Sequence, residues 1–241
     1  MKVIKRIFIG LGLLLVLAVL GFFAWTRVSR YPATDPAQRV AATATMTSQR
    51  WLTFTPRNAS SPSSGLIIYP GGLVDYAAYA PLADAIAQRG FFVVLLPMPL
   101  DLAILDSNAA APVFAAYPNI KTWALAGHSL GGTAAAQFVV ANPGMLAGLV
   151  FWASYPTSSA GFAATRILSI YGSDDGVLSR KDQALADTLP AGTSFVKIAG
   201  GNHAMFGSYG AQKGDNSLGI SEDDARLAIT NATAVFMSGL R

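Results

Sequence analysis

The chain has 241 residues, of which 52% are apolar and only 12% charged, so its length suits one medium-sized domain. Its formal net charge is +4, but five of the 17 basic residues lie in the first 30 positions, and the other 12 face all 13 acidic residues. This balance excludes a nucleic-acid partner, because no basic run or patch remains to neutralise phosphates. The absence of cysteine excludes a disulfide framework.

The first feature along the chain is an unbroken, uncharged and mostly apolar run over residues 7–25. As a helix it would be about 28 Å long, which matches the hydrocarbon core of a bilayer. We therefore predict a transmembrane helix at 7–25, with residues 1–6 in the cytoplasm because more basic side chains precede the run than follow it. A cleaved signal peptide is the alternative. The length of the run and its aromatic end favour an uncleaved signal anchor, with the rest of the chain on the extracytoplasmic side.

Residues 26–48 are rich in Ala, Thr, Ser and Pro and show no clear periodicity. We interpret them as a stalk. The folded domain is expected to span residues 49–241.

The domain alternates short apolar runs with helical patterns. Strands are expected at 50–55, 65–69, 91–96, 121–126, 146–152, 166–171 and 194–198, and helices at 75–89, 130–141, 179–189 and 221–237. This alternation predicts an α/β fold, a mostly parallel sheet with helices on both faces. The connection at 153–165 is too short for a helical cap, so we expect a minimal cap or none.

The stretch Gly127-His128-Ser129-Leu130-Gly131 matches the G-x-S-x-G pattern of a nucleophile elbow. In such an elbow a strand ends, the chain turns through the serine in a strained conformation, and a helix begins at once. A Cβ at either flanking glycine would collide with a neighbouring element. Ser129 is therefore the candidate nucleophile.

In a parallel sheet, catalytic groups gather in the loops that follow the strands. The next-to-last predicted strand is followed by Asp174 and Asp175, and the last by His203. The order serine, carboxylate, histidine is that of the α/β-hydrolase triad. His128, the other of the two histidines, adjoins the nucleophile and should point away from it, so His203 is the candidate general base.

A tetrahedral intermediate also needs donors for its oxyanion. We expect one from the backbone N–H of Leu130, the first residue of the helix after the nucleophile, and a second from Gly72 or Leu73 in the glycine turn that follows a predicted strand. A plain strand-ending turn is the alternative interpretation of these glycines.

The remaining polar residues give no further site. Two histidines, no cysteine and scattered carboxylates do not predict a metal site, and no phosphate loop or dinucleotide fingerprint indicates a cofactor. Tyr79 is interpreted as a helix packing residue, and Asp215 as an ordinary loop carboxylate.

The elbow, the glycine turn at 69–75 and the stretches at 171–176 and 200–210 resemble the bacterial α/β-hydrolases related to dienelactone hydrolase. The resemblance covers about residues 50 to 240 and implies a serine hydrolase fold and triad. It favours Asp175, because the acid of such hydrolases commonly stands three positions after the strand-ending glycine. Leu73 and Met205 replace an expected lysine and glutamine, and the cysteine nucleophile of dienelactone hydrolase is absent, so the resemblance implies no substrate.

The sequence thus predicts a serine esterase that cleaves a small carboxylic ester through an acyl-enzyme, with the membrane as its other partner. A thioesterase or amidase using the same catalytic triad is one alternative. A catalytically silent binding protein with the same fold is another, which the presence of all three triad residue types disfavours. The oligomeric state is not predicted.

Overall fold

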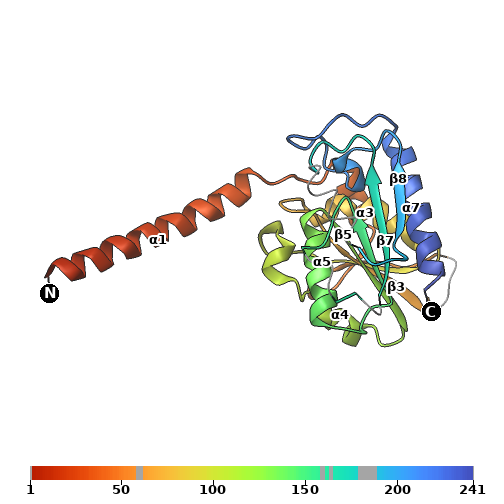
Figure 1. Ribbon diagram of the computed structural model, residues 1–241, viewed down its shortest axis with the longest axis horizontal. Helices are drawn as coiled ribbons and strands as arrows, with labels where there is room; N and C mark the ends of the chain where they lie inside the picture. The colour runs from red at the N-terminus through yellow and green to blue at the C-terminus, as the bar shows by residue number, and fades with distance from the viewer. Residues whose placement is uncertain (1, 58–61, 158–160, 163–164, 179–188, 241) are drawn as a thin grey trace. The chain divides into compact units, whose positions relative to one another are not determined.

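The structure is a computed structural model that describes the chain except residues 1, 58–61, 158–160, 163–164, 179–188 and 241 (Figure 1). The chain divides into two compact units, Met1–Arg30 and Tyr31–Arg241. The first unit is helix α1 (Lys2–Val28), within which Ile4–Val28 is long and apolar enough to cross a membrane. Its mean hydropathy reaches 2.8, and the predicted run lies inside it.

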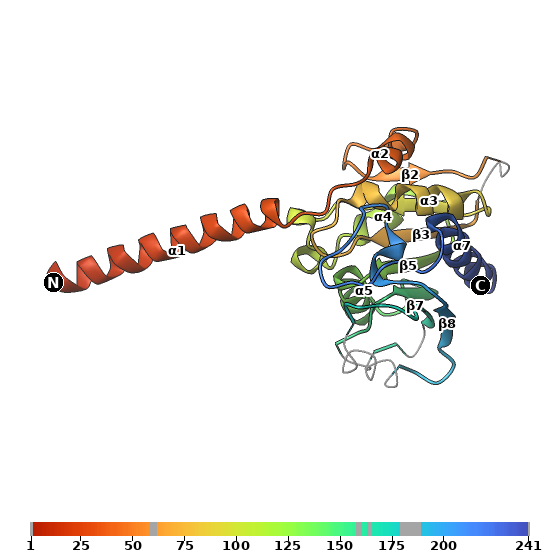
Figure 2. The same ribbon diagram turned by 90° about the horizontal axis from the view of Figure 1, so that it is seen from above.

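The second unit is built on an eight-stranded sheet with the order β1-β2-β4-β3-β5-β6-β7-β8 (Figure 2). Strand β2 pairs antiparallel with both of its neighbours, β1 and β4. The other strands pair in parallel, as predicted. The bounds are β1 (Thr45–Met46), β2 (Leu52–Phe54), β3 (Ser64–Tyr69), β4 (Phe92–Leu95), β5 (Thr122–His128), β6 (Gly148–Trp152), β7 (Arg166–Gly172) and β8 (Ser194–Ile198).

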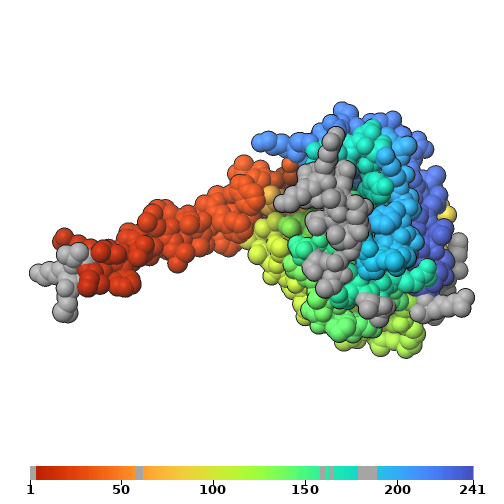
Figure 3. Space-filling view, in the orientation of Figure 1, coloured from red at the N-terminus to blue at the C-terminus, as the bar shows by residue number. Residues whose placement is uncertain are grey.

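Helices cover both faces of the sheet, and Figure 1 shows α5 and α7 on opposite sides of it. One core contains residues of α2 (Asp35–Ala41), α3 (Ala80–Ala87) and α7 (Glu222–Ser238). The other contains residues of α4 (Ala111–Ala116) and α5 (Leu130–Ala141). Successive residues of β3 alternate between the two cores, which is why the inner strands are apolar on both faces. By contrast, β8 is an edge strand that lies at the surface (Figure 3).

Local capping explains where two of the predicted helices begin. The Asp75 carboxylate accepts a hydrogen bond from the Ala77 amide and opens the 3₁₀ turn η1 (Tyr76–Tyr79), which leads into α3. The Ser221 hydroxyl accepts from the Asp224 amide at the start of α7, whose first turn is acidic. Helix α5 matches its predicted range. The helix predicted at 179–189 falls almost wholly on residues 179–188, outside the described part of the chain.

The predicted stalk at 26–48 is wrong from Tyr31 onward, because these residues belong to the compact unit. Helix α2 starts at Asp35, and Ala33 and Ala37 are buried in the core next to α3. The Tyr31 amide donates to the Leu73 carbonyl, and its own carbonyl accepts from the Asp75 amide. Small residues conceal this packing in the sequence, because a short alanine-containing helix shows no long apolar period.

Two further findings concern the connections between strands. The sequence did not predict the segment between β4 and β5, which forms two 3₁₀ turns, η2 (Pro99–Asp101) and η3 (Ala103–Asp106), before α4. The connection between β6 and β7 has neither helix nor strand among its described residues, 153–157, 161–162 and 165. No cap is built there in the part of the chain that the structure describes.

Candidate active site

Ser129 stands where β5 ends and α5 begins, with φ 50° and ψ −121°. This conformation is strained for a residue with a side chain, and a nucleophile elbow requires it. A Cβ on Gly127 would collide with the backbone of Gly131, and a Cβ on Gly131 would collide with the backbone of Pro70. The geometry matches the predicted elbow, with Gly131 packed against the end of β3 rather than against β5.

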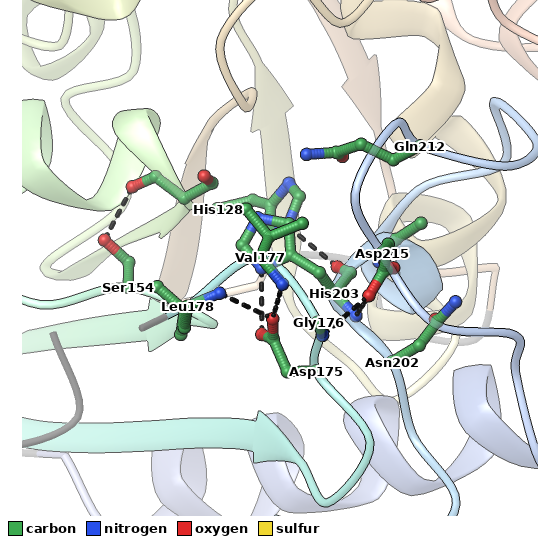
Figure 4. Close-up of polar contacts among 12 residues, drawn as sticks. His128, Ser154, Asp175, Gly176, Val177, Leu178, Asn202, His203, Gln212 and Asp215 are labelled. Carbon is green, nitrogen blue, oxygen red and sulfur yellow. Dashed lines mark hydrogen bonds and ion pairs between the residues drawn. The ribbon is translucent and has the colours of Figure 1, made fainter. Parts of the chain in front are cut away.

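Asp175 and His203 form a buried pair (Figure 4). Asp175 follows β7, and His203 opens the 3₁₀ turn η4 (His203–Phe206) after β8. Asp175 Oδ2 lies 2.8 Å from His203 Nδ1, and their side chains are 2% and 0% exposed. Asp175 Oδ1 accepts from the amides of Val177 and Leu178. Burial alone would raise the pKa of Asp175, but its bonds to His203 and to the two amides hold it below its ordinary value.

The pair defines the tautomer of His203. Because an ionised carboxylate only accepts hydrogen bonds, Nδ1 carries the proton of the neutral ring, and Nε2 of that ring presents a lone pair. Nε2 is buried and has no hydrogen-bond partner among the described residues. An imidazole held in this way can take a proton from a nearby hydroxyl at Nε2.

The adjacent Asp174 has different surroundings. Its side chain is exposed, and Oδ1 accepts from the Ser173 hydroxyl at 2.7 Å. Of the two carboxylates, Asp175 is therefore the one that contacts His203.

Asp215 is a residue whose importance the sequence analysis missed. Its Oδ1 accepts from the amides of Gly176, at 3.0 Å, and His203, at 3.1 Å, and its Oδ2 accepts from the Ala204 amide at 2.8 Å. The carboxylate thereby joins the loop after β7 to the loop after β8 (Figure 4). No sequence signal could have identified it, because its partners are backbone groups distant in the chain.

The structure corrects one of the three predicted oxyanion donors. The Leu73 amide donates to the Asp101 carbonyl at 2.7 Å, so its hydrogen is already in use. The amides of Gly72 and Leu130 have no such acceptor among the described residues. These two residues are close, because a Cβ on Gly72 would lie 3.1 Å from the Leu130 side chain. Gly72 and Leu130 therefore remain candidate donors, and Leu73 does not.

Residues with strained backbone cluster at the carboxyl ends of the strands. Five of the six described non-glycine residues with positive φ follow strands β3, β4, β5 or β6. They are Leu73, Leu100, Asp101, Ser129 and Ala153, with φ between 44° and 61°. Such conformations cost on the order of 1–3 kcal/mol each and cluster at functional sites. This supports a site at the carboxyl ends of the strands.

His128 does not contact the Asp175 carboxylate, since its ring nitrogens lie near the Tyr79 hydroxyl and the His203 carbonyl. Over the described residues, no group of three or more histidine and acidic side chains could hold a metal ion.

A parallel sheet with a strained serine after a central strand and a buried Asp–His pair in the later loops defines the α/β-hydrolase class. A model of the alpha/beta hydrolase family matches residues 65–226, and the chain belongs to this family. The predicted α/β fold and the resemblance to the α/β-hydrolases are therefore confirmed. No curated protein matches the chain.

Similar solved structures show the same fold. They include the esterase domain of a Rhodothermus marinus protein, with 15% identity and a TM-score of 0.54 over 76% of this chain and 89% of that one. A serine hydrolase without a lid from Xanthomonas campestris has 15% identity and a TM-score of 0.54 over 79% and 90%. A provisionally assigned dienelactone hydrolase from Klebsiella pneumoniae has 15% identity and a TM-score of 0.54 over 78% and 92%.

Proposed function

We propose that the chain is a serine hydrolase of small carboxylic esters, with Ser129 as nucleophile, His203 as general base and Asp175 as the residue that orients it. The buried Asp175–His203 pair with its unpaired Nε2 carries the proposal. The ring of His128, the residue next to Ser129, has its centroid 4.8 Å from that of His203, which brings the elbow close to the base. Membership of the alpha/beta hydrolase family supports hydrolytic activity.

The reaction follows from these roles. Ser129 Oγ attacks the acyl carbon while His203 Nε2 takes the hydroxyl proton. The bond to the leaving alkoxide breaks, His203 returns the proton to it, and an acyl-enzyme forms. Water then attacks the acyl carbon, with His203 again moving the proton, and the acid and free Ser129 are released. Asp175 stays ionised and stabilises the imidazolium in both steps.

The oxyanion of each tetrahedral intermediate would be bound by the amides of Gly72 and Leu130. Leu130 is the first residue of α5, so its N–H lies at the positive end of the helix dipole. Preorganised donors of this kind are worth roughly 10²–10³ in rate each.

A fluorophosphonate probe tests the nucleophile directly. Full-length protein in detergent should be labelled covalently, and Ser129→Ala should not be labelled. Ser154→Ala is a matched control that should still be labelled. Ser154 is buried nearby and its hydroxyl donates to the Ser129 carbonyl, but the substitution leaves the Ser129 hydroxyl in place. Folded wild-type protein that resists the probe would instead favour a catalytically silent binding protein.

The leaving group is tested separately. Matched esters, thioesters and anilides of one short acid should give the highest kcat/KM for the ester. A clear preference for the thioester or the anilide would reassign the substrate class while keeping the triad.

We also propose that α1 is an uncleaved anchor with its N-terminus in the cytoplasm, which places the domain on the extracytoplasmic side. The excess of basic residues before the apolar run supports this orientation. In intact spheroplasts, external protease should digest the domain. Without protease, the membrane fraction should contain the full-length chain. Recovery of a shortened, soluble chain would identify α1 as a signal peptide.

A further inference from the structure

Gly71, Tyr79, His128 and His203 form one buried series of hydrogen bonds behind the candidate active site. The Gly71 amide nitrogen lies 2.8 Å from Tyr79 Oη, which lies 2.7 Å from His128 Nδ1. His128 Nε2 lies 3.0 Å from the His203 carbonyl oxygen. Tyr79 and His128 are 0% and 1% exposed, so water does not compete for these bonds.

The two ends of this series determine the direction of the two outer bonds, and a neutral His128 ring determines that of the central one. The Gly71 amide can only donate, and the His203 carbonyl can only accept. His128 Nε2 therefore carries a proton. Nδ1 of the neutral ring then accepts from the Tyr79 hydroxyl, whose oxygen accepts from Gly71. In this arrangement the Tyr79 hydroxyl hydrogen also has an acceptor, which the series would not give it if His128 were doubly protonated.

The surroundings of His128 maintain this form. Its ring is packed against Tyr79 from η1, His203 and Phe206 from η4, and Tyr209, with centroids 4.8–6.5 Å away. Burial and the neighbouring His203 lower the pKa of His128 well below its ordinary value, outweighing the bond to the His203 carbonyl. Burial raises the pKa of Tyr79 and of Tyr209, so both stay neutral. His203 is the neighbour that gains charge during the proposed reaction.

The series connects two parts of the proposed machinery. Gly71 immediately precedes Gly72, whose amide is a proposed oxyanion donor, and the other end holds the backbone of the proposed general base. The packing is tight, because a Cβ on Gly71 would lie 2.7 Å from His128 Nδ1 and 3.0 Å from Tyr79 Oη. A shift at either end would therefore be transmitted to the other.

We propose that Tyr79 and His128 are positioning residues that hold the Gly72 amide and the His203 imidazole at the correct mutual distance for catalysis. This role rests on the proposed serine hydrolase function. Each residue acts through a backbone group, Tyr79 at the glycine turn and His128 at the His203 carbonyl. Displacements of about 1 Å in such a site can lower the rate roughly 100-fold.

Three substitutions separate the bonds. Tyr79→Phe leaves the Gly71 amide and His128 Nδ1 unpaired. His128→Asn provides an acceptor for the Tyr79 hydroxyl but removes the bond to His203, and His128→Gln provides a donor for the His203 carbonyl but removes the bond to Tyr79. Each should lower kcat on a short ester by about 10- to 100-fold with KM nearly unchanged. The double variant Tyr79→Phe/His128→Asn should lose little more than the worse single variant, because the series is already broken.

Tyr76→Phe is the matched control. Tyr76 lies on the same turn, η1, and its hydroxyl donates to the Arg50 carbonyl at 3.3 Å in a solvent-exposed hydrogen bond. This substitution should leave kcat within about twofold of wild type, since it does not touch the buried series.

A second measurement is independent of both activity and the folding of variants. Only two histidines occur in the chain, so nitrogen NMR of the ¹⁵N-histidine-labelled full-length protein in detergent resolves each ring. His128 should be protonated at Nε2 and not at Nδ1, and should remain neutral at about pH 5, below the ordinary histidine pKa of about 6.5. A proton on Nδ1, or titration near the ordinary pKa, would overturn the proposed bond directions.

The kinetic outcomes separate this role from the function on which it rests. Absence of probe labelling at Ser129 in wild-type protein contradicts the hydrolase itself. If the wild type is labelled and the folded Tyr79 and His128 variants keep wild-type kcat, only the positioning role is contradicted, and the hydrolase function stands. Variants that lose thermal stability but keep kcat in the folded fraction contradict it as well.

Discussion

Asp174 and Asp175 are neighbours in the chain, yet their carboxylates have different surroundings. Asp175 is buried against the His203 ring, whereas Asp174 is exposed and bonded to Ser173. Asp215 in turn holds the backbone of the loops that follow β7 and β8. At the scale of single residues, the candidate site therefore depends on which carboxylate accepts from which donor.

Substitution of the two adjacent aspartates should separate their roles. Asp175→Asn should lower kcat by roughly 10⁴-fold with the fold intact, because the amide favours the wrong tautomer of His203. Asp174→Asn, the matched control, should change kcat by less than about threefold. Steady-state kinetics of both on one ester checks this, and a larger loss at Asp174 would reverse the assignment.

The lowered pKa of Asp175 predicts how stability depends on pH. A carboxyl whose pKa is lower in the folded than in the unfolded state stabilises the fold above its unfolded pKa of about 3.9 and loses this contribution as pH falls through the folded-state value. The Tm difference between wild type and Asp175→Asn should be constant near neutral pH and narrow below about pH 4. Thermal melts from pH 3 to 7 measure it. A difference independent of pH would show that the carboxylate charge contributes nothing.

At the scale of elements, the glycine turn after β3 is supported by segments distant in the chain. The Tyr31 amide and carbonyl are hydrogen-bonded to Leu73 and Asp75 in this turn. The Asp101 carbonyl accepts from the Leu73 amide. The Thr34 amide also donates to the Ser208 carbonyl in the loop that follows η4. The residues expected to be a stalk thus form part of the support of the candidate site.

Two shortened chains test this support. A chain that begins at residue 30 should be soluble and retain wild-type kcat, because it keeps the whole compact unit. A chain that begins at residue 45 lacks α2 and three backbone hydrogen bonds of Tyr31 and Thr34. At about 1 kcal/mol each, these losses should lower Tm by roughly 6–12 °C and reduce kcat as the glycine turn loosens. Equal Tm and kcat in the two chains would restore the interpretation of this segment as a stalk.

At the scale of the whole molecule, the strand order brings the proposed site together. Strands β3, β5, β6, β7 and β8 lie side by side in parallel, so the loops that carry Gly72, Ser129, Asp175 and His203 all leave the same edge of the sheet. The short connection between β6 and β7 leaves this edge without a helical cap among its described residues.

We predict a preference for short acyl chains, because a site without a helical cap gives a long chain little apolar surface to bury. Esters of two- to four-carbon acids should have kcat/KM values at least roughly tenfold above those of twelve-carbon acids. A series of p-nitrophenyl esters measured below their micelle concentrations checks it. Faster turnover of the long esters would indicate an acyl groove.

The sequence by itself determined the order of strands β2 to β8 and of helices α3, α5 and α7, together with the candidate triad. Strands and helices follow from the local period of apolar residues, which needs no knowledge of neighbours in space, and β3 to β8 and α5 lie close to their predicted ranges. The elbow is also local, because its glycines and Ser129 are adjacent in the chain. Placing His203 in a loop after a strand required only the rule that parallel strands end at one edge of the sheet.

Only the tertiary structure decided which groups are bonded to each other. Leu73 lost its predicted role because its amide meets Asp101, and Asp215 and Tyr79 gained importance because each bonds to the backbone of a distant segment. Every residue except proline carries the same backbone donor and acceptor, so a sequence pattern cannot tell which of them a side chain will reach. That depends on the order of strands in the sheet and on the path of the loops between them, which are set by the packing of the whole domain.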